Sequence, residues 1–168
     1  MATEINTAVI KDGKVMQVKV STDITPGVGI HLLGINDKTI RDCLLRTITA
    51  MQSQGYFIPG RKICTVIDPD ISGLDDCHCD LPIAMGIVMS SEQVNLREVN
   101  RCLIMGRLNL DGTLRDIHEP QAMAEYARSN DLLVTMPMYQ ALTLPKELIE
   151  YTLMVDSLSE LIEILKVK

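Results

Sequence analysis

One stretch, residues 80–94 (DLPIAMGIVMSSEQV), constrains the fold more than any other part of the chain. Asp80 begins it, Pro82 follows within a first helical turn, and the residues after it give one apolar face (Ile83, Ala84, Ile87, Val88 and Val94). Proline is tolerated there because the N–H group that it lacks would have had no partner. We expect Asp80 to cap the free amides and to interact favourably with the helix dipole. The stretch predicts a buried helix, preceded by a loop that is either a functional site or only the approach to a core helix.

The rest of the sequence predicts strands and helices in alternation. Asp12-Gly13 is a strong turn signal and predicts a hairpin of residues 5–11 and 14–24. Apolar residues recur at helical spacing up to about residue 54, after a cap at Asn36 or Asp37 and before Gly55. Further strands are expected at 30–33, 61–67, 101–110, 132–136 and 151–155, and further helices at 119–129 and 158–167, with a short helical turn at 139–142. This order predicts a mixed α/β fold (α+β, with a mixed sheet) in a single domain, residues 1–168.

Composition limits the classes of function. A chain of 168 residues can bury a core without disulfides or metals, and with no Trp and one Phe that core should be aliphatic and rich in Met. A net charge of −6 argues against a free-standing nucleic-acid binder, because such proteins normally present a basic face. We therefore expect nucleic acid not to be a partner.

The cysteines and the chain start indicate the cellular setting. Five scattered cysteines are an odd number, and residues 1–14 lack the basic and apolar regions of a signal peptide. No apolar run approaches the roughly 20 residues that a membrane helix needs. The sequence thus predicts a cytoplasmic protein that does not enter a membrane and whose thiols are mostly buried as small apolar groups.

The loop from Asp75 to Cys79 holds the candidate metal ligands Cys77, His78 and Cys79. Zinc sites usually space two cysteines by two to four residues, which lets both thiolates bend onto one ion. Here one residue separates the cysteines, and no second ligand pair is evident. We interpret the segment as a solvated acidic loop, with a metal site or a reactive thiol as the alternatives. No cofactor is predicted.

Two other groups of residues resemble sites less closely. The glycines within residues 27–34 lack the dinucleotide-binding spacing, and the G-x-x-x-x-G-K-[ST] phosphate loop occurs nowhere, so we interpret them as turn glycines. Asp116, His118 and Glu119 could form an acid–base set. Because Glu119 lies at a predicted helix start, capping and interaction with the helix dipole are the better interpretation.

Five short blocks occur in one order between about residues 5 and 145, and they include GYxxPxRKI, DLPIA and GxLxLxGxLR. The blocks are residues 26–41, 54–63, 80–84, 91–93 and 106–115. Together they resemble the magnesium-chelatase-subunit-I-like family, in particular its ComM-like branch. The resemblance implies the N-terminal, Lon-protease-like α/β domain of such proteins. In full-length members an AAA+ ATPase module follows, and its phosphate-binding and Walker B motifs are absent from this sequence.

The resemblance raises the question of catalysis, because Lon-type domains hydrolyse peptides with a Ser–Lys dyad. The serine would lie around residues 80–82 and the lysine within 116–124, and this chain has neither residue type at those places. Without a nucleophile and an amine to activate it, covalent peptide hydrolysis cannot proceed. We predict no catalytic residues and no peptidase activity.

Three functions follow as hypotheses. The first is a stand-alone, non-catalytic Lon-like domain that acts as an interaction or assembly module, either as a homo-oligomer or with a separately encoded AAA+ ATPase. The second is a metal-binding protein or enzyme that uses the Asp75-to-Cys79 loop. The third, a DNA-processing accessory as in ComM-like proteins, follows from the resemblance alone. It is opposed by the net charge and by the acidic run where relatives tend to have a Gly-rich, basic loop.

Overall fold

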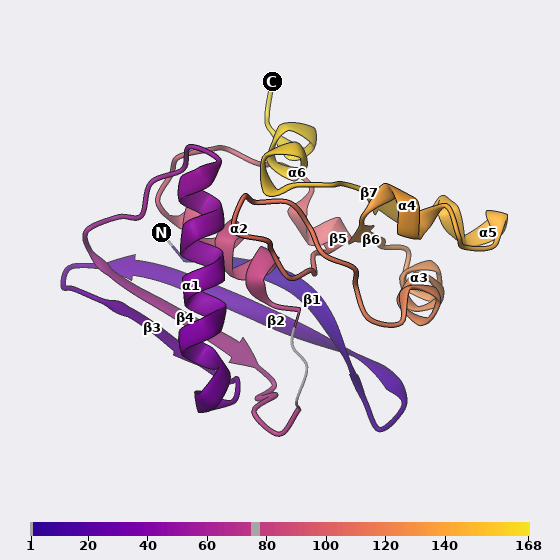
Figure 1. Cartoon of the computed structure of the whole chain (residues 1–168), viewed down its shortest axis with the longest axis horizontal. Coiled ribbons are helices and arrows are strands. Elements are labelled where there is room, and N and C mark those ends of the chain that lie inside the picture. The colour runs from indigo at the N-terminus through magenta and orange to yellow at the C-terminus, as the bar shows by residue number, and fades with distance from the viewer. Residues whose placement is uncertain (1, 75–77) are drawn as a thin grey trace.

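The computed structural model describes residues 2–74 and 78–168, which form two sheets and a set of helices (Figure 1). The strands are β1 (Thr3–Lys11), β2 (Lys14–Thr25), β3 (Ile30–Leu33), β4 (Lys62–Asp68), β5 (Cys102–Leu103), β6 (Leu133–Met136) and β7 (Thr152–Met154). The helices are α1 (Asp37–Ser53), α2 (Asp80–Ser90), α3 (Pro120–Ser129), α4 (Met138–Ala141), α5 (Lys146–Ile149) and α6 (Leu158–Leu165), and a 3-10 turn, η1 (Val99–Arg101), precedes β5. The mixed α/β class predicted from the sequence is confirmed.

The larger sheet has the strand order β1-β2-β4-β3 and is mixed. β1 and β2 form the predicted antiparallel hairpin, with Lys11 opposite Lys14 and both turn residues, Asp12 and Gly13, at positive φ. This geometry suits the right-handed twist of a tight hairpin. β4 runs antiparallel to β2 and parallel to β3, so β3 is an edge strand. The glycines at 27, 29 and 34 flank β3 at positive φ, in agreement with their interpretation as turn residues.

The smaller sheet, β5-β6-β7, is parallel throughout and departs from the sequence-based expectation. A strand was expected over 101–110, but only Cys102–Leu103 is a strand. The reason is that Gly106, at φ +145°, exchanges backbone hydrogen bonds with the chain around the start of α2: its N–H donates to His78, and its carbonyl accepts from Leu81. α5, which follows Pro145, was not predicted either.

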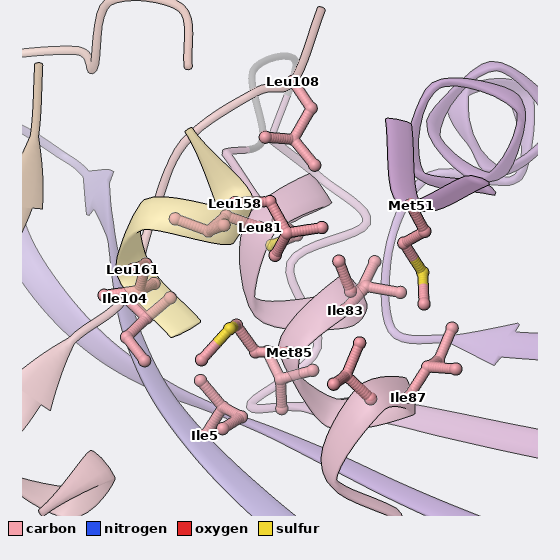
Figure 2. Packing of buried hydrophobic residues seen from close by; sticks show 14 of the residues in the cluster. Ile5, Met51, Leu81, Ile83, Met85, Ile87, Ile104, Leu108, Leu158 and Leu161 are labelled. Carbon is pink, nitrogen blue, oxygen red and sulfur yellow. The ribbon is translucent and has the colours of Figure 1, made fainter. Parts of the chain in front are cut away.

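α2 lies on one face of the larger sheet, and α1 packs against it (Figure 1). Every residue of α2 except Met89 is buried, as its apolar sequence predicted. Figure 2 shows Leu81, Ile83, Met85 and Ile87 of α2 among side chains from β1, α1 and α6. A second apolar cluster lies around β6 and α3. No helix in the described part of the chain has both the length and the apolar character needed to cross a membrane.

Candidate functional site

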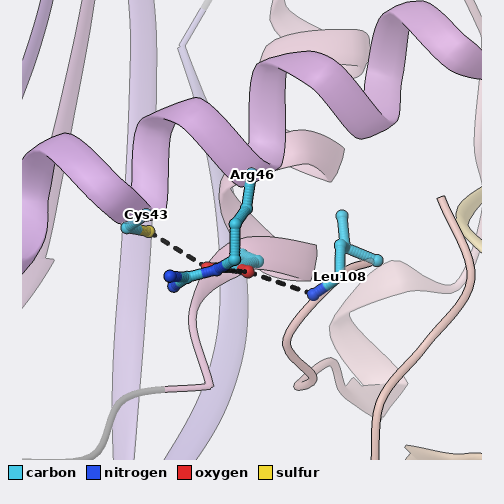
Figure 3. A network of polar contacts seen from close by, with 4 residues as sticks. Cys43, Arg46 and Leu108 are labelled. Atoms are coloured by element: carbon cyan, nitrogen blue, oxygen red, sulfur yellow. Dashed lines mark hydrogen bonds and ion pairs between the residues drawn. The ribbon is translucent and has the colours of Figure 1, made fainter. Parts of the chain in front are cut away.

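The buried carboxylate of Asp80 is at the centre of a polar network at the start of α2. Asp80 is the first residue of the helix and is fully buried. Its two oxygens accept hydrogen bonds from Arg46 Nε (2.8 Å) and Nη2 (3.1 Å), from the Cys43 thiol (3.1 Å) and from the Leu108 amide (3.0 Å) (Figure 3). The network therefore joins α1, the start of α2 and the segment after β5.

The predicted capping role of Asp80 is wrong. The cap position belongs to Cys79, whose side chain makes no capping hydrogen bond, and the Asp80 carboxylate is bonded to α1 and Leu108 instead. A carboxylate removed from water needs charged and hydrogen-bonding partners, and Arg46 supplies a two-pronged one. That hydrogen bond raises the pKa of the Arg46 guanidinium above its usual value. The sequence could have indicated this pair, because Asp80 is a single acidic residue at the start of an apolar helix. A carboxylate buried there needs a cation from elsewhere in the chain.

An open, polar cavity of about 580 Å³ lies beside this network. It is bounded by the residue pair before α2, by the irregular segment between β5 and α3, and by the first turn of α4. The lining residues are His78, Arg107, Asn109, Leu114, Arg115, Asp116, Ile117, His118 and Tyr139. The rings of His78 and His118 are stacked, with their centroids 6.2 Å apart. The cavity is thus rich in cationic and hydrogen-bonding side chains.

A short hairpin forms the cationic wall of the cavity. Leu108 and Leu114 are bridged antiparallel, and the Arg115 amide donates to the Arg107 carbonyl at 2.9 Å. The neighbours of Arg107 are fixed as well, because Gly106 and Leu108 each donate a backbone hydrogen bond to the start of α2. The Asp80 network therefore fixes the backbone from which Arg107 extends.

The sequence-predicted site residues are only partly brought together. Among residues 2–74 and 78–168, no three His, Cys, Asp or Glu side chains gather closely enough to hold a metal ion. Cys77 lies outside the described residues, so the structure does not test the solvated-loop interpretation or its alternative, a metal site at Cys77, His78 and Cys79. His78 lines the cavity and its ring stacks on that of His118, whereas Cys79 is buried and does not line the cavity.

The second predicted group consists of Asp116, His118 and Glu119, and its members lie in two different places. Asp116 and His118 line the cavity. Glu119 occupies the N-cap position of α3 at φ +52°, but its side chain forms no capping hydrogen bond, so its predicted capping role is wrong. Sequence reasoning missed Arg107 and Arg115, for which the signal was two arginines on either side of the Asp111-Gly112 turn.

Comparison with known proteins gives the family. The profile of the family described as "Subunit ChlI of Mg-chelatase" matches residues 18–138, more than half of the chain. The chain is 28% identical over 101 residues to the uncharacterized protein YifB of Escherichia coli, covering 60% of this chain and 20% of that protein. It is 26% identical over 108 residues to the competence protein ComM of Haemophilus influenzae, covering 63% of this chain and 21% of that protein. The chain thus spans about one fifth of the length of the curated relatives it matches. It belongs to the family of subunit ChlI of Mg-chelatase, and it is similar to ComM and YifB.

Proposed function

We propose that this domain is a non-catalytic interaction module that assembles with copies of itself or with a AAA+ ATPase. The observation on which the proposal rests is the edge strand β3. An edge strand presents unpaired backbone N–H and C=O groups to which another strand can add, and natural proteins usually protect such edges with charged side chains or proline. β3 is short, at four residues, but it has no charged side chain and no proline, since its sequence is IHLL.

The side chains at this edge support the same proposal. Leu33 of β3 and Val66 of β4 are register partners on the sheet face opposite α2, and they are 64% and 42% exposed. The next residue in this row, Ser21 of β2, is only partly exposed. An apolar pair at an open edge is the arrangement expected where a second strand would add backbone hydrogen bonds and cover side chains together.

The family relationship adds a second line of support. The matched relatives extend well beyond this domain, so in those proteins the domain lies in a longer chain that it can contact. The non-catalytic part of the proposal is supported by the residues at the start of α2. Leu81, Pro82 and Ile83 offer no nucleophile, and Asp80 is already paired with Arg46.

The test is the molar mass of the purified chain by light scattering, alone and mixed with candidate AAA+ ATPases. We expect an oligomer or a complex, and a lower mass for both Leu33→Glu and Val66→Glu. Leu142→Glu is the matched control, because Leu142 is 60% exposed and follows α4, at the other end of the molecule from β3 (Figure 1). A strictly monomeric chain in every mixture, or an equal effect of all three variants, would contradict the proposal.

A further inference from the structure

We propose that the cavity beside the start of α2 binds a small phosphorylated ligand, with Arg107 and Arg115 as the residues that bind the phosphate group. This function is separate from assembly through β3. The proposal begins with the arginines themselves. Neither forms an ion pair with any residue in the described part of the chain, and the buried Nε of Arg107 has no hydrogen-bond partner there.

A buried N–H group without a partner costs free energy, and native proteins usually satisfy such groups. Arg107 cannot easily leave its position, because its own carbonyl and the amides on either side of it are all hydrogen-bonded. The backbone that carries the Arg107 side chain is therefore fixed, and the side chain lines the cavity. An oxyanion in the cavity would supply the guanidinium with an acceptor.

The position of Arg115 makes the case for an anion stronger. Its amide donates to the Arg107 carbonyl, so the two arginines are partners across the hairpin and both line the cavity. Like charges directly opposite one another in paired strands repel. An anion between them would turn this repulsion into two sets of charge-assisted hydrogen bonds. Asp116 is the one acidic group among the described lining residues, so the cationic character is only partly offset.

Size and chemistry indicate the ligand class. A cavity of about 580 Å³ is in the range of small-molecule sites, roughly 300–1,000 Å³. A phosphate monoester offers three terminal oxygens to two guanidinium groups and the neighbouring imidazole of His118, whereas a carboxylate offers only two oxygens. Tyr139, 58% exposed, provides an aromatic surface for the organic part, and Asn109 and Asp116 can bond its hydroxyl or amino groups. We therefore expect a phosphate monoester with an uncharged organic part.

Isothermal titration calorimetry of the whole chain tests the proposal with inorganic phosphate, phenyl phosphate, benzoate and a short single-stranded oligothymidylate. We expect saturable binding of phenyl phosphate, weaker binding of inorganic phosphate, and little binding of benzoate. Arg107→Gln and Arg115→Gln should each weaken phenyl phosphate binding about tenfold or more, as for the loss of a hydrogen bond to a charged group. Arg107→Lys should fall between wild type and Arg107→Gln, because lysine keeps the charge but not the planar fork.

Arg41→Gln is the matched control, since it removes one exposed positive charge from α1, outside the cavity. It should leave binding unchanged, and circular dichroism should show all variants folded. Absence of saturable phenyl phosphate binding by the wild-type chain would overturn the proposal. So would an equal loss in Arg41→Gln, or binding of the oligonucleotide in preference to the monoester. None of these results depends on whether the chain assembles through β3.

Discussion

At the scale of single residues, Asp80 is the clearest case of a group whose energetics depend on its partners. Its carboxylate is removed from water, and four donors form hydrogen bonds with its two oxygens in place of water. Arg46, whose side chain is 21% exposed, provides the opposite charge. Replacing a buried ion pair with apolar residues is often tolerated, whereas removing one partner leaves an uncompensated charge. The pair is therefore sensitive to single substitutions and much less so to a double one.

We expect Arg46→Met to lower the free energy of unfolding by about 3–5 kcal/mol, because Asp80 then remains buried without a cation. The double variant Arg46→Met, Asp80→Leu should recover a large part of that loss. Urea unfolding of the single and double variants gives the interaction energy as a double-mutant cycle. A loss below about 1 kcal/mol for Arg46→Met would mean that the ion pair does not stabilise this junction.

At the scale of elements, the sequence predicts what depends on local pattern. The Asp12-Gly13 turn, the Asn36 cap of α1 and the apolar run of α2 each have a local physical cause, and all three are present in the structure. What failed depends on distant residues. The strand expected over 101–110 ends at Leu103 because Gly106 bonds to the start of α2, about 25 residues earlier. The spacing of residues in the sequence does not indicate that Gly106 bonds to the start of α2.

The candidate site shows the same division. His78 and His118 could be singled out because of their residue type, but their stacking depends on bringing together two segments that are 40 positions apart in the sequence. Arg107 and Arg115 could have been paired from the intervening Asp111-Gly112 turn. Their lack of an ion-pair partner among residues 2–74 and 78–168 could not be predicted, because it depends on which acidic residues the fold brings near.

A further prediction at this scale concerns the contact between α2 and β2. A Cβ added at Gly86 would overlap the side chain of Thr22, which is buried and hydrogen-bonded to Thr65. Gly86→Ala gains helix propensity of about 1 kcal/mol at most, but overpacking costs about 1–3 kcal/mol. We expect a net loss of stability in thermal or urea unfolding. Gly60→Ala is the control, since a Cβ there meets nothing within 4 Å. A more stable Gly86→Ala would show that the sheet and helix move apart without cost.

At the scale of the whole molecule, the open edge and the cavity belong to different parts of the fold. β3 is the last strand of the larger sheet, whereas the cavity is formed by the segment between β5 and α3 together with α4. α2 links the two regions, because its body packs on the larger sheet and its first residue fixes the cavity wall through Leu108. Because β3 and the cavity share no lining residue, the proposals for assembly and for ligand binding can be tested by separate substitutions.

The last prediction concerns the chain as a potential peptidase. Covalent hydrolysis needs an exposed nucleophile with a base to activate it. At the start of α2 the Cys79 side chain is buried, Asp80 is committed to Arg46, and Leu81 and Ile83 are fully buried and apolar. We expect no hydrolysis of fluorogenic casein above a buffer blank, across fractions of a gel-filtration peak of the purified chain. Activity that follows the chain's own absorbance profile through purification to homogeneity would contradict this. Activity displaced from that profile would belong to a contaminant.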